Sequence, residues 1–191
     1  RDEGARCRDF VVAARDIEPY SAFLAMAMAR YDIPVFLAEK PDLLSRPPMA
    51  LVTNALEAVR NYFRYEDLFS CLKTGLAGLD WDEIDKLENY VLTWNIRGGA
   101  WEREWTEHPD GYGLSIDENA KAQLAELNTL RKRAIAPFSA LREALAGEQP
   151  AGDCVRALYA FLLAVDAPQR MIDRAAGHEQ AGRLQLADEY R

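Results

Sequence analysis

The distribution of hydrophobic and polar positions changes near residue 46. From residue 49 onward, hydrophobic residues recur at the three- to four-residue spacing of one helix face. A Pro47-Pro48 pair stands immediately before this region and marks the break. The stretches with this spacing are 49–63, 66–73, 80–94, 115–133, 153–165 and 168–190. The pattern therefore predicts a helical domain over residues 46–191.

The first 45 residues show a different pattern. Residues 10–14 and 33–37 are short apolar runs of the kind typical of strands, and 19–31 between them has helical spacing, with Pro19 in its first turn. This order predicts a β-α-β unit over residues 1–45. Two parallel strands need a wider sheet to cover both faces, so we expect the unit to be the edge of a larger sheet.

Helix boundaries are indicated by capping residues. Asp80 with Glu83, and Ser115 with Glu118, have the spacing of capping boxes and are predicted to open helices. Pro137 is predicted to interrupt or kink the second of these helices.

The stretch between these two helices has no clear period. Gly98-Gly99 is predicted to end the helix that begins after Asp80. Residues 101–113 are rich in aromatic and turn residues, which predicts an ordered surface loop.

Composition narrows the functional classes. Of 191 residues, 49% are hydrophobic, which is enough for a buried core, and a formal charge of −8 argues against an extended basic groove for nucleic acid while leaving room for a local basic patch. Three distant cysteines argue against a disulfide framework and favour a reducing compartment, so we expect a cytoplasmic protein. No apolar run approaches the roughly 18 residues of a membrane span.

Catalytic motifs are missing from the sequence. The histidines, His108 and His178, stand in no recognisable constellation with a nucleophile. No G-x-x-x-x-G-K-[ST] phosphate loop occurs, and the nearest string, Lys73-Thr74-Gly75, has the letters in the wrong order. We therefore expect no catalytic residue, no metal site and no resident cofactor in this chain.

An acidic cluster allows two interpretations. Asp80, Asp82, Glu83, Asp85 and Glu88 could be the carboxylates of a two-metal nuclease site. Acidic residues in the first turn of a helix are also favoured by the helix dipole. Asp85 and Glu88 are three residues apart and can simply face solvent. The spacing favours the structural interpretation.

Arg15 stands directly after the predicted strand at 10–14 and before the predicted helix. Ligands of open α/β sheets bind at the carboxyl edge of the strands, where a guanidinium suits phosphate oxygens. Arg15 is therefore a candidate for a nucleotide phosphate contact. The alternative is that it pairs with Asp16, Glu18 or another part of the protein.

Candidate DNA contacts are Lys73 and Arg97, the basic residues around which local positive patches are expected. Aromatic residues near Arg97 could stack on the bases of a single strand, although such residues beside a helix end are more often core anchors, and their loop is locally acidic. These aromatic residues are Trp94, Trp101, Trp105 and Tyr112.

Several strings resemble a known family. FVVAARDIEPY at 10–20 and YDIPVFLAEK at 31–40 resemble the start of the second motor-like lobe of UvrD-type helicase folds. More specific are FRYEDLF at 63–69, LKTGL at 72–76 and IDKLENYVL at 84–92, followed by Ile96-Arg97-Gly98 and Trp101. In this order they resemble the AddB (RexB) subunit of the ATP-dependent helicase/deoxyribonuclease that processes double-strand breaks.

The resemblance implies an internal segment of a much longer chain. Residues 1–45 would be the edge of the RecA-like lobe 2A, and residues 46–191 a helical 2B-like domain without catalytic residues. Arg15 matches the position where UvrD-like helicases direct an arginine toward the nucleotide phosphates. The parent would use ATP, Mg²⁺ and an iron–sulfur cluster outside this segment, act on DNA, and bind an AddA/RexA-type partner subunit.

Two positions depart from the family pattern. Arg46-Pro47 stands where a His-Pro pair is usual, and Trp94-Asn95 where a glycine often precedes the Ile-x-Gly. Two other functions stay open: a helical protein-interaction module unrelated to DNA, and a metalloenzyme built on the acidic cluster. The expected role is to shape the DNA path and to dock the partner subunit.

Overall fold

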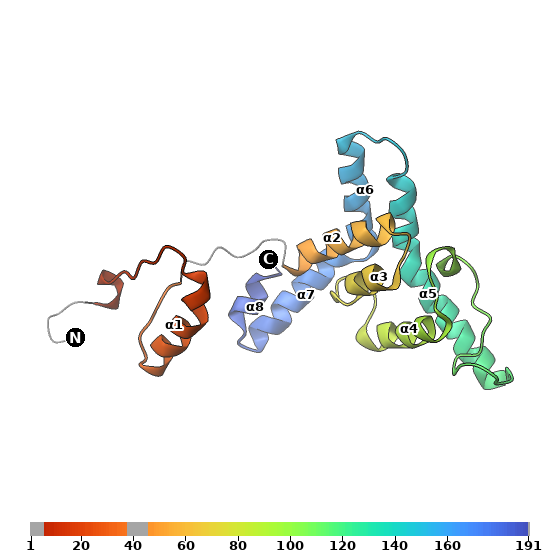
Figure 1. Ribbon diagram of the computed structural model, residues 1–191, viewed down its shortest axis with the longest axis horizontal. Helices are drawn as coiled ribbons and strands as arrows, with labels where there is room; N and C mark the ends of the chain where they lie inside the picture. Colours follow the sequence, from red (N-terminus) through yellow and green to blue (C-terminus); the bar gives the residue numbers. More distant parts are fainter. Residues whose placement is uncertain (1–5, 38–45, 191) are drawn as a thin grey trace. The chain divides into compact units, whose positions relative to one another are not determined.

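Residues 6–37 and 46–190 are described by the computed structural model in Figure 1. The chain divides into two compact units, Arg1–Asp42 and Leu43–Arg191. Every regular element of the described residues is a helix, so the expectation of a mainly α protein is confirmed. Among these helices, none is long and apolar enough to span a bilayer.

The first unit contains a short 3₁₀-helix, η1 (Cys7–Asp9), and one α-helix, α1 (Glu18–Arg30). Pro19 lies in the first turn of α1, where its missing N–H would have no helical partner in any case. The chain leaves the helix through Asp32, whose left-handed backbone (φ 50°) lets the Ile33 N–H donate to a carbonyl in the last turn at 2.9 Å. The helix predicted in this region is confirmed.

The predicted β-α-β unit is wrong: the described residues contain no strand. A strand requires backbone N–H and C=O groups paired with a neighbouring strand, and the described residues offer 10–14 and 33–37 no such neighbour. Phe10, Val11 and Phe36 are 70%, 90% and 90% exposed. An apolar run indicates a tendency toward burial, but it does not supply the pairing partner.

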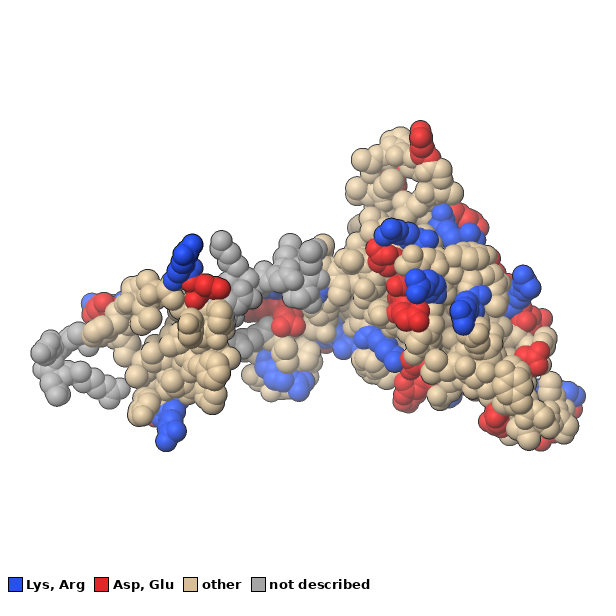
Figure 2. Space-filling view, viewed as in Figure 1, with Lys and Arg blue, Asp and Glu red and all other residues tan. Residues whose placement is uncertain are grey.

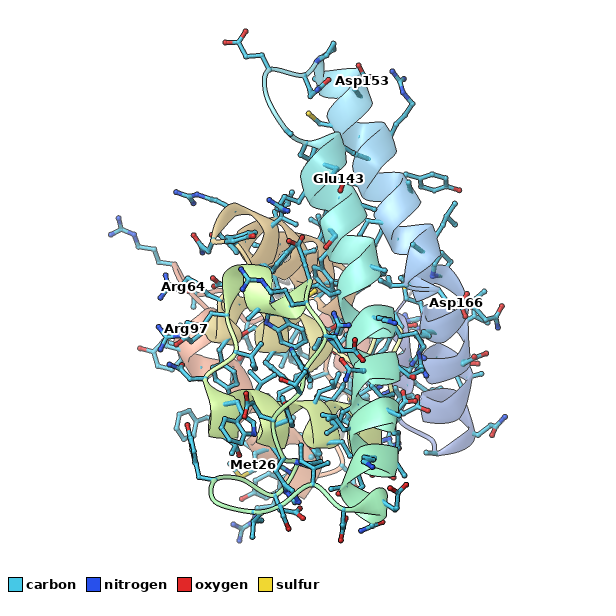
Figure 3. The ribbon with its side chains drawn as sticks, turned by 90° about the vertical axis from the view of Figure 1, so that its right-hand side faces the viewer. Met26, Arg64, Arg97, Glu143, Asp153 and Asp166 are labelled. Atoms are coloured by element: carbon cyan, nitrogen blue, oxygen red, sulfur yellow. The ribbon has the colours of Figure 1, made fainter. Side chains whose placement is uncertain are left out.

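The second unit is built from helices joined by turns and one longer segment. Their bounds are α2 (Pro47–Arg60), α3 (Tyr65–Leu72), α4 (Trp81–Trp94), η3 (Gly98–Trp101), α5 (Glu118–Ala144), α6 (Ala151–Ala164), α7 (Ala167–Gln180) and α8 (Leu184–Asp188). The long helix α5 packs against α2, α4 and α6, while α3 packs against α2 and α4. Figure 3 shows α5 and α6 as an antiparallel pair whose shared end carries Glu143 and Asp153.

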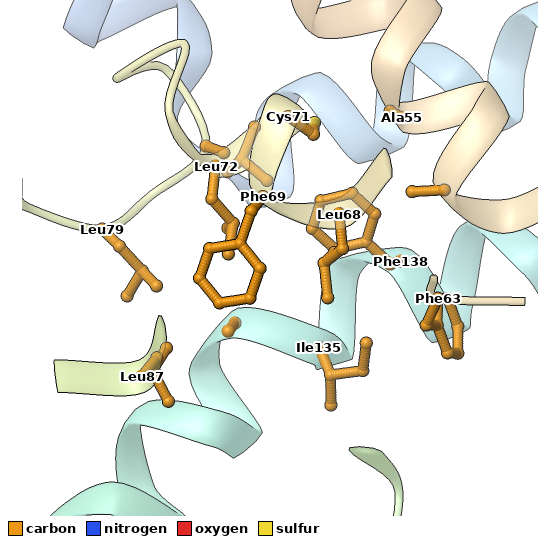
Figure 4. Close-up of a cluster of buried hydrophobic side chains, with 14 of the residues drawn as sticks. Ala55, Phe63, Leu68, Phe69, Cys71, Leu72, Leu79, Leu87, Ile135 and Phe138 are labelled. Carbon is orange, nitrogen blue, oxygen red and sulfur yellow. The ribbon is translucent and has the colours of Figure 1, made fainter. Parts of the chain in front are cut away.

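A cluster of buried hydrophobic side chains joins α2, α3, α4 and α5 (Figure 4). Leu68 and Leu72 of α3 and Phe138 of α5 have no exposed surface. Burial of one such side chain stabilises by about 1.5–3 kcal/mol. The packing of Phe138 and Leu141 therefore offsets the roughly 3 kcal/mol cost of a proline inside a helix, and α5 continues through Pro137 instead of being interrupted there.

The predicted capping chemistry holds for α4 but not for α5. The Asp80 N–H donates to Glu83 Oε2 at 3.0 Å, as a capping box requires. At α5 the Asp117 carboxylate accepts from the Ala120 N–H at 2.8 Å, so the prediction of Ser115 as the cap is wrong. Aspartate and serine are comparable N-caps, and spacing alone does not choose between them.

The end of α4 also differs from the prediction. Asn95, and not Gly98-Gly99, ends the helix in a left-handed conformation (φ 51°, ψ 47°), and the Ile96 N–H donates to the Val91 carbonyl at 3.0 Å. Asparagine tolerates this conformation better than most residues other than glycine. Asn95 thus ends the helix at the position where the family pattern described above often has a glycine. Further along the chain, Gly182 (φ 72°) separates α7 from α8.

The segment after η3 is held by a buried polar network. Asn128 Oδ1 accepts from the Trp105 N–H and its Nδ2 donates to the Trp105 carbonyl, both at 2.9 Å. Arg131 donates from Nη1 to the Trp101 carbonyl at 2.6 Å and from Nε to Asn128 Oδ1 at 3.1 Å. Burial lowers the pKa of Arg131, yet a guanidinium stays charged in proteins. The network satisfies backbone groups that no helix or sheet pairs.

Aromatic packing continues from this network toward α4. The Tyr90 and Trp105 rings stack at 4.6 Å, and the Tyr90 hydroxyl pairs with the backbone of Glu107, donating to its carbonyl at 3.1 Å and accepting from its N–H at 3.2 Å. Burial raises the pKa of Tyr90 to about 12. Trp101 and Trp105 are 0% and 4% exposed. The predicted surface loop is therefore an ordered segment whose tryptophans lie in the core.

We expect Asn128→Ala to lower the free energy of unfolding by about 2–4 kcal/mol, because each buried backbone group left unpaired costs roughly 1–3 kcal/mol. Urea unfolding followed by tryptophan fluorescence measures this, since all tryptophans lie in the second unit. Asn89→Ala, on the exposed face of α4, is the matched control and should change stability by less than about 0.5 kcal/mol. Equal effects of the two substitutions would contradict the structural role of Asn128.

Candidate functional site

Exposed arginines gather where the end of α2, the start of α3 and the segment after α4 meet. Arg64 and Arg97 line the same hollow, and Figure 3 shows them on one edge of the second unit. Figure 2 shows basic side chains over this part of the unit, with acidic ones between them. We use the name arginine surface for the exposed Arg60, Arg64, Arg97 and Arg103 together with the half-buried Arg142 of α5.

Carboxylates neutralise part of this surface. Arg60 lies 3.3 Å from Glu57 and Arg142 lies 3.0 Å from Glu102. Arg64 makes a looser contact of 3.9 Å with a third carboxylate, that of Glu66.

Arg97 and Arg103 have no carboxylate within ion-pairing distance in the described part of the chain. Arg97 Nε and Nη2 donate instead to the neutral Asn95 Oδ1 at 2.8 and 2.6 Å. A local positive charge therefore persists on a chain whose formal net charge is −8.

The position of Arg97 depends on a strained turn. Tyr62 and Phe63 both have left-handed backbones, with φ of 50° and 58°. Such residues cost of order 1–3 kcal/mol each, which the complete burial of Phe63 helps to offset. The Tyr62 ring lies so close to Gly98 that a Cβ there would be 3.0 Å from two ring carbons. Gly98 is therefore required beside Arg97, both for this approach and for its own φ of 52°.

Arg142 completes the support of this turn. Its guanidinium lies 4.7 Å from the centroid of the Tyr62 ring, and the Tyr62 hydroxyl lies 3.5 Å from Glu102 Oε2. The same Glu102 carboxylate accepts from Arg142 at 3.0 Å. These contacts link α5 to the turn that carries the arginine surface.

A hollow of about 280 Å³ lies between the start of α3 and the end of α4. Val91, Leu92 and Ile96 supply its apolar lining, and Arg64 and Arg97 its cations. Leu92 is 56% exposed, which is unusual for a leucine beside a core and leaves the hollow open to solvent. The hollow thus combines apolar surface with two guanidinium groups.

Lys73, predicted as a DNA contact, is held by a carboxylate. Glu88 Oε1 accepts from Lys73 Nζ and from the Tyr65 hydroxyl, each at 2.6 Å. The hydrogen bond to Glu88 raises the pKa of both Lys73 and Tyr65. Burial opposes ionisation of Glu88, but its hydrogen bonds outweigh this and lower its pKa. The Lys73 charge is therefore largely compensated within the protein.

Arg15 belongs to the first unit and does not line this hollow. It lies exposed at a bend before α1. The positional argument for it required a strand at 10–14, and that argument is lost because no strand is present there. Its contact with a nucleotide phosphate stays a prediction.

Three carboxylates of the acidic cluster, Asp80, Glu83 and Glu88, form ion pairs. Glu83 forms a two-pronged pair with Arg133, at 3.0 and 2.7 Å, and Asp80 lies 3.5 Å from Arg170. Glu88 is held by Lys73. No group of three His, Cys, Asp or Glu side chains suited to a metal occurs among the described residues. The contacts agree with the structural interpretation of this cluster.

Sequence reasoning identified Arg97 but missed Arg64 and Arg142. One signal for Arg64 was available in the sequence: an arginine stands at the start of a helix, where Ser, Thr, Asp or Asn is the preferred N-cap. In the structure Arg64 is the N-cap of α3, and its side chain makes no capping hydrogen bond. For Arg142 no comparable signal exists, because its contact with Tyr62 spans distant parts of the chain.

Comparison with known proteins finds similarity to helicase–nuclease subunits. The chain is 34% identical over 194 residues to the B subunit of the ATP-dependent helicase/deoxyribonuclease of Acetivibrio thermocellus. It is 35% identical over 195 residues to the same protein of Desulforamulus reducens, and 35% identical over 199 residues to that of Heliobacterium modesticaldum. Each match covers 100% of this chain but only 17%, 17% and 16% of the relative's length. No family model matches the chain.

We expect Glu83→Gln to lower stability by about 1 kcal/mol at pH 7, because it removes the charge-assisted pair with Arg133. Burial opposes ionisation of Glu83, but hydrogen bonds from Arg133 and the Asp80 N–H outweigh it and lower its pKa below the ordinary 4.5. A carboxylate whose pKa is lower in the folded state stabilises the fold fully above its unfolded-state pKa. This stabilisation is lost as the pH falls through the folded-state pKa. Urea unfolding at several pH values should therefore show the two proteins converging in acid. A difference independent of pH would contradict this account.

Proposed function

Because this chain belongs to the family of the B subunits of ATP-dependent helicase/deoxyribonucleases, we propose that it forms a non-catalytic helical part of such a protein, which guides DNA and docks the partner subunit. The arginine surface is the observation that carries the DNA-guiding role. Guanidinium groups bind phosphate oxygens through paired donors, and the free charge of Arg97 is suited to a DNA backbone. Lys73 would contribute less, since Glu88 holds it at 2.6 Å.

Support for the docking role comes from helix α6, which is apolar on two faces. Ala157 and Phe161 are buried against the unit, whereas Val155, Tyr159 and Leu163 are 64%, 62% and 52% exposed. These three residues follow each other at four-residue spacing and form one stripe along the helix. A helix that is apolar on both sides normally has a second packing partner. We assign the stripe, defined by these three residues, to the partner subunit, of the AddA/RexA type.

The setting follows from the family. The relatives are named as subunits of an ATP-dependent helicase and deoxyribonuclease, and the proposed setting of this chain is double-strand-break processing and recombinational repair in the cytoplasm. The ATP, Mg²⁺ and iron–sulfur cluster expected of the parent would be bound outside this chain, whose sequence contains no phosphate loop. The purified chain should accordingly hydrolyse neither ATP nor DNA.

Arg97→Ala should weaken DNA binding by the purified chain several-fold and reduce the slope of log affinity against log salt by about one, as expected for one lost phosphate contact. Fluorescence anisotropy of a labelled oligonucleotide over a salt series measures both quantities. Arg156→Ala removes the same charge from α6, where Arg156 pairs with Asp153, and is the control that should leave binding unchanged. Equal losses in the two variants would mean that net charge, and not the arginine surface, governs binding.

Leu163→Asp in the complete protein should abolish stable association with the partner subunit, because it places a charge in the apolar stripe. Leu114→Asp is the matched control, since Leu114 is 54% exposed and Leu163 is 52% exposed. Size-exclusion chromatography of the mixed subunits measures association, and the thermal midpoint checks that both variants fold. Normal association of Leu163→Asp would reassign the stripe to another part of the same protein.

A further inference from the structure

The hollow beside Arg64 and Arg97 has features that contact with a DNA phosphate backbone does not require. Binding to phosphates needs only cations on an accessible surface, as Arg60 and Arg103 provide nearby. The hollow adds accessible apolar surface, chiefly from Leu92 and Ile96, directly beside two guanidinium groups. Its volume of about 280 Å³ lies just below the range of small-molecule sites, roughly 300–1,000 Å³, and suits part of a ligand such as one nucleotide.

We propose that this hollow binds one unstacked nucleotide of single-stranded DNA, with its base on the apolar lining and its phosphate at Arg64 and Arg97. The proposal rests on the proposed contact with DNA and specifies the strand state that this site recognises. Bases in a duplex are paired and stacked inside the helix, so they cannot enter a hollow on a protein surface. A single strand can turn a base outward at little cost and bury its face against side chains.

The rim of the hollow offers one feature that discriminates between bases. Glu66 also lines the hollow, and its largely exposed carboxylate makes only a loose contact of 3.9 Å with Arg64. A carboxylate accepts hydrogen bonds from exocyclic amino groups, as it does from cytosine N4. Thymine has no such amino group. The hollow should therefore prefer cytosine to thymine.

The surrounding contacts hold the hollow in shape before any ligand binds. Asn61 Nδ2 donates to Asp67 Oδ2 at 2.8 Å and ties the end of α2 to the first turn of α3. The Tyr65 hydroxyl donates to Glu88 at 2.6 Å and ties α3 to α4. The left-handed Asn95 directs the chain toward Arg97 and holds its guanidinium. A rigid site loses little conformational entropy on binding.

The test compares three variants of the 191-residue chain on a short oligo-dC strand, oligo-dT and a duplex of mixed sequence, by fluorescence anisotropy at low salt. Leu92→Gln replaces apolar lining with a neutral polar group and should weaken oligo-dC binding by about five-fold or more, because it removes most of the apolar surface, roughly 1 kcal/mol or more, that the base would bury, without changing duplex binding. Leu114→Gln, at a similarly exposed leucine, should change neither. Glu66→Ala should abolish the preference for oligo-dC.

The outcomes separate this proposal from the proposed DNA contact. If Leu92→Gln leaves oligo-dC binding unchanged, or weakens strand and duplex alike, the nucleotide site is overturned. Equal binding of oligo-dC and oligo-dT by the unmodified chain would overturn the assignment of Glu66. If Arg97→Ala changes binding to neither strand nor duplex, the DNA contact itself is overturned, and the nucleotide site with it.

Discussion

The second unit depends on the side-chain amide of Asn128. Trp101 ends η3, and the segment after it has neither helical nor sheet hydrogen bonding. Trp101 and Trp105 nevertheless lie in the core, where unpaired backbone groups would be costly. Asn128 pairs with both backbone groups of Trp105, and Arg131 satisfies the Trp101 carbonyl. The aromatic core, and the position of the arginines that flank it, follow from this polar network.

A second constraint lies in the match between strained turns and small residues. The left-handed Tyr62 places its ring so close to residue 98 that a Cβ there would be crowded, and Gly98, which also has a left-handed backbone, avoids this contact. The contact sets the position of Arg97 relative to the turn that leads to Arg64. Two arginines separated by a whole helix pair in the sequence thereby line one hollow. Strain in the backbone is thus connected directly to the proposed binding site.

Charge on this protein is distributed in a way that net charge conceals. Two acidic residues of α4 pair with basic residues elsewhere in the second unit, Glu83 with Arg133 and Glu88 with Lys73. Arg97 instead donates a hydrogen bond to the neutral side chain of Asn95. An acidic chain can therefore present a basic surface, because ion pairing removes charge of both signs locally. The charge of Lys73 is compensated by Glu88, whereas the charge of Arg97 is available to a ligand.

The sequence by itself determined most of the helices and the similarity to helicase/deoxyribonuclease B subunits, because helical spacing, the Asp80–Glu83 cap and the strings around IDKLENYVL depend only on neighbouring residues. It misassigned 10–14 and 33–37, since strand formation requires a partner that local composition does not reveal. The tertiary structure alone decided that Pro137 stays inside a helix, and that Arg64 and Arg97 share a hollow. These outcomes depend on packing and contacts between residues far apart in the chain, which no local pattern encodes.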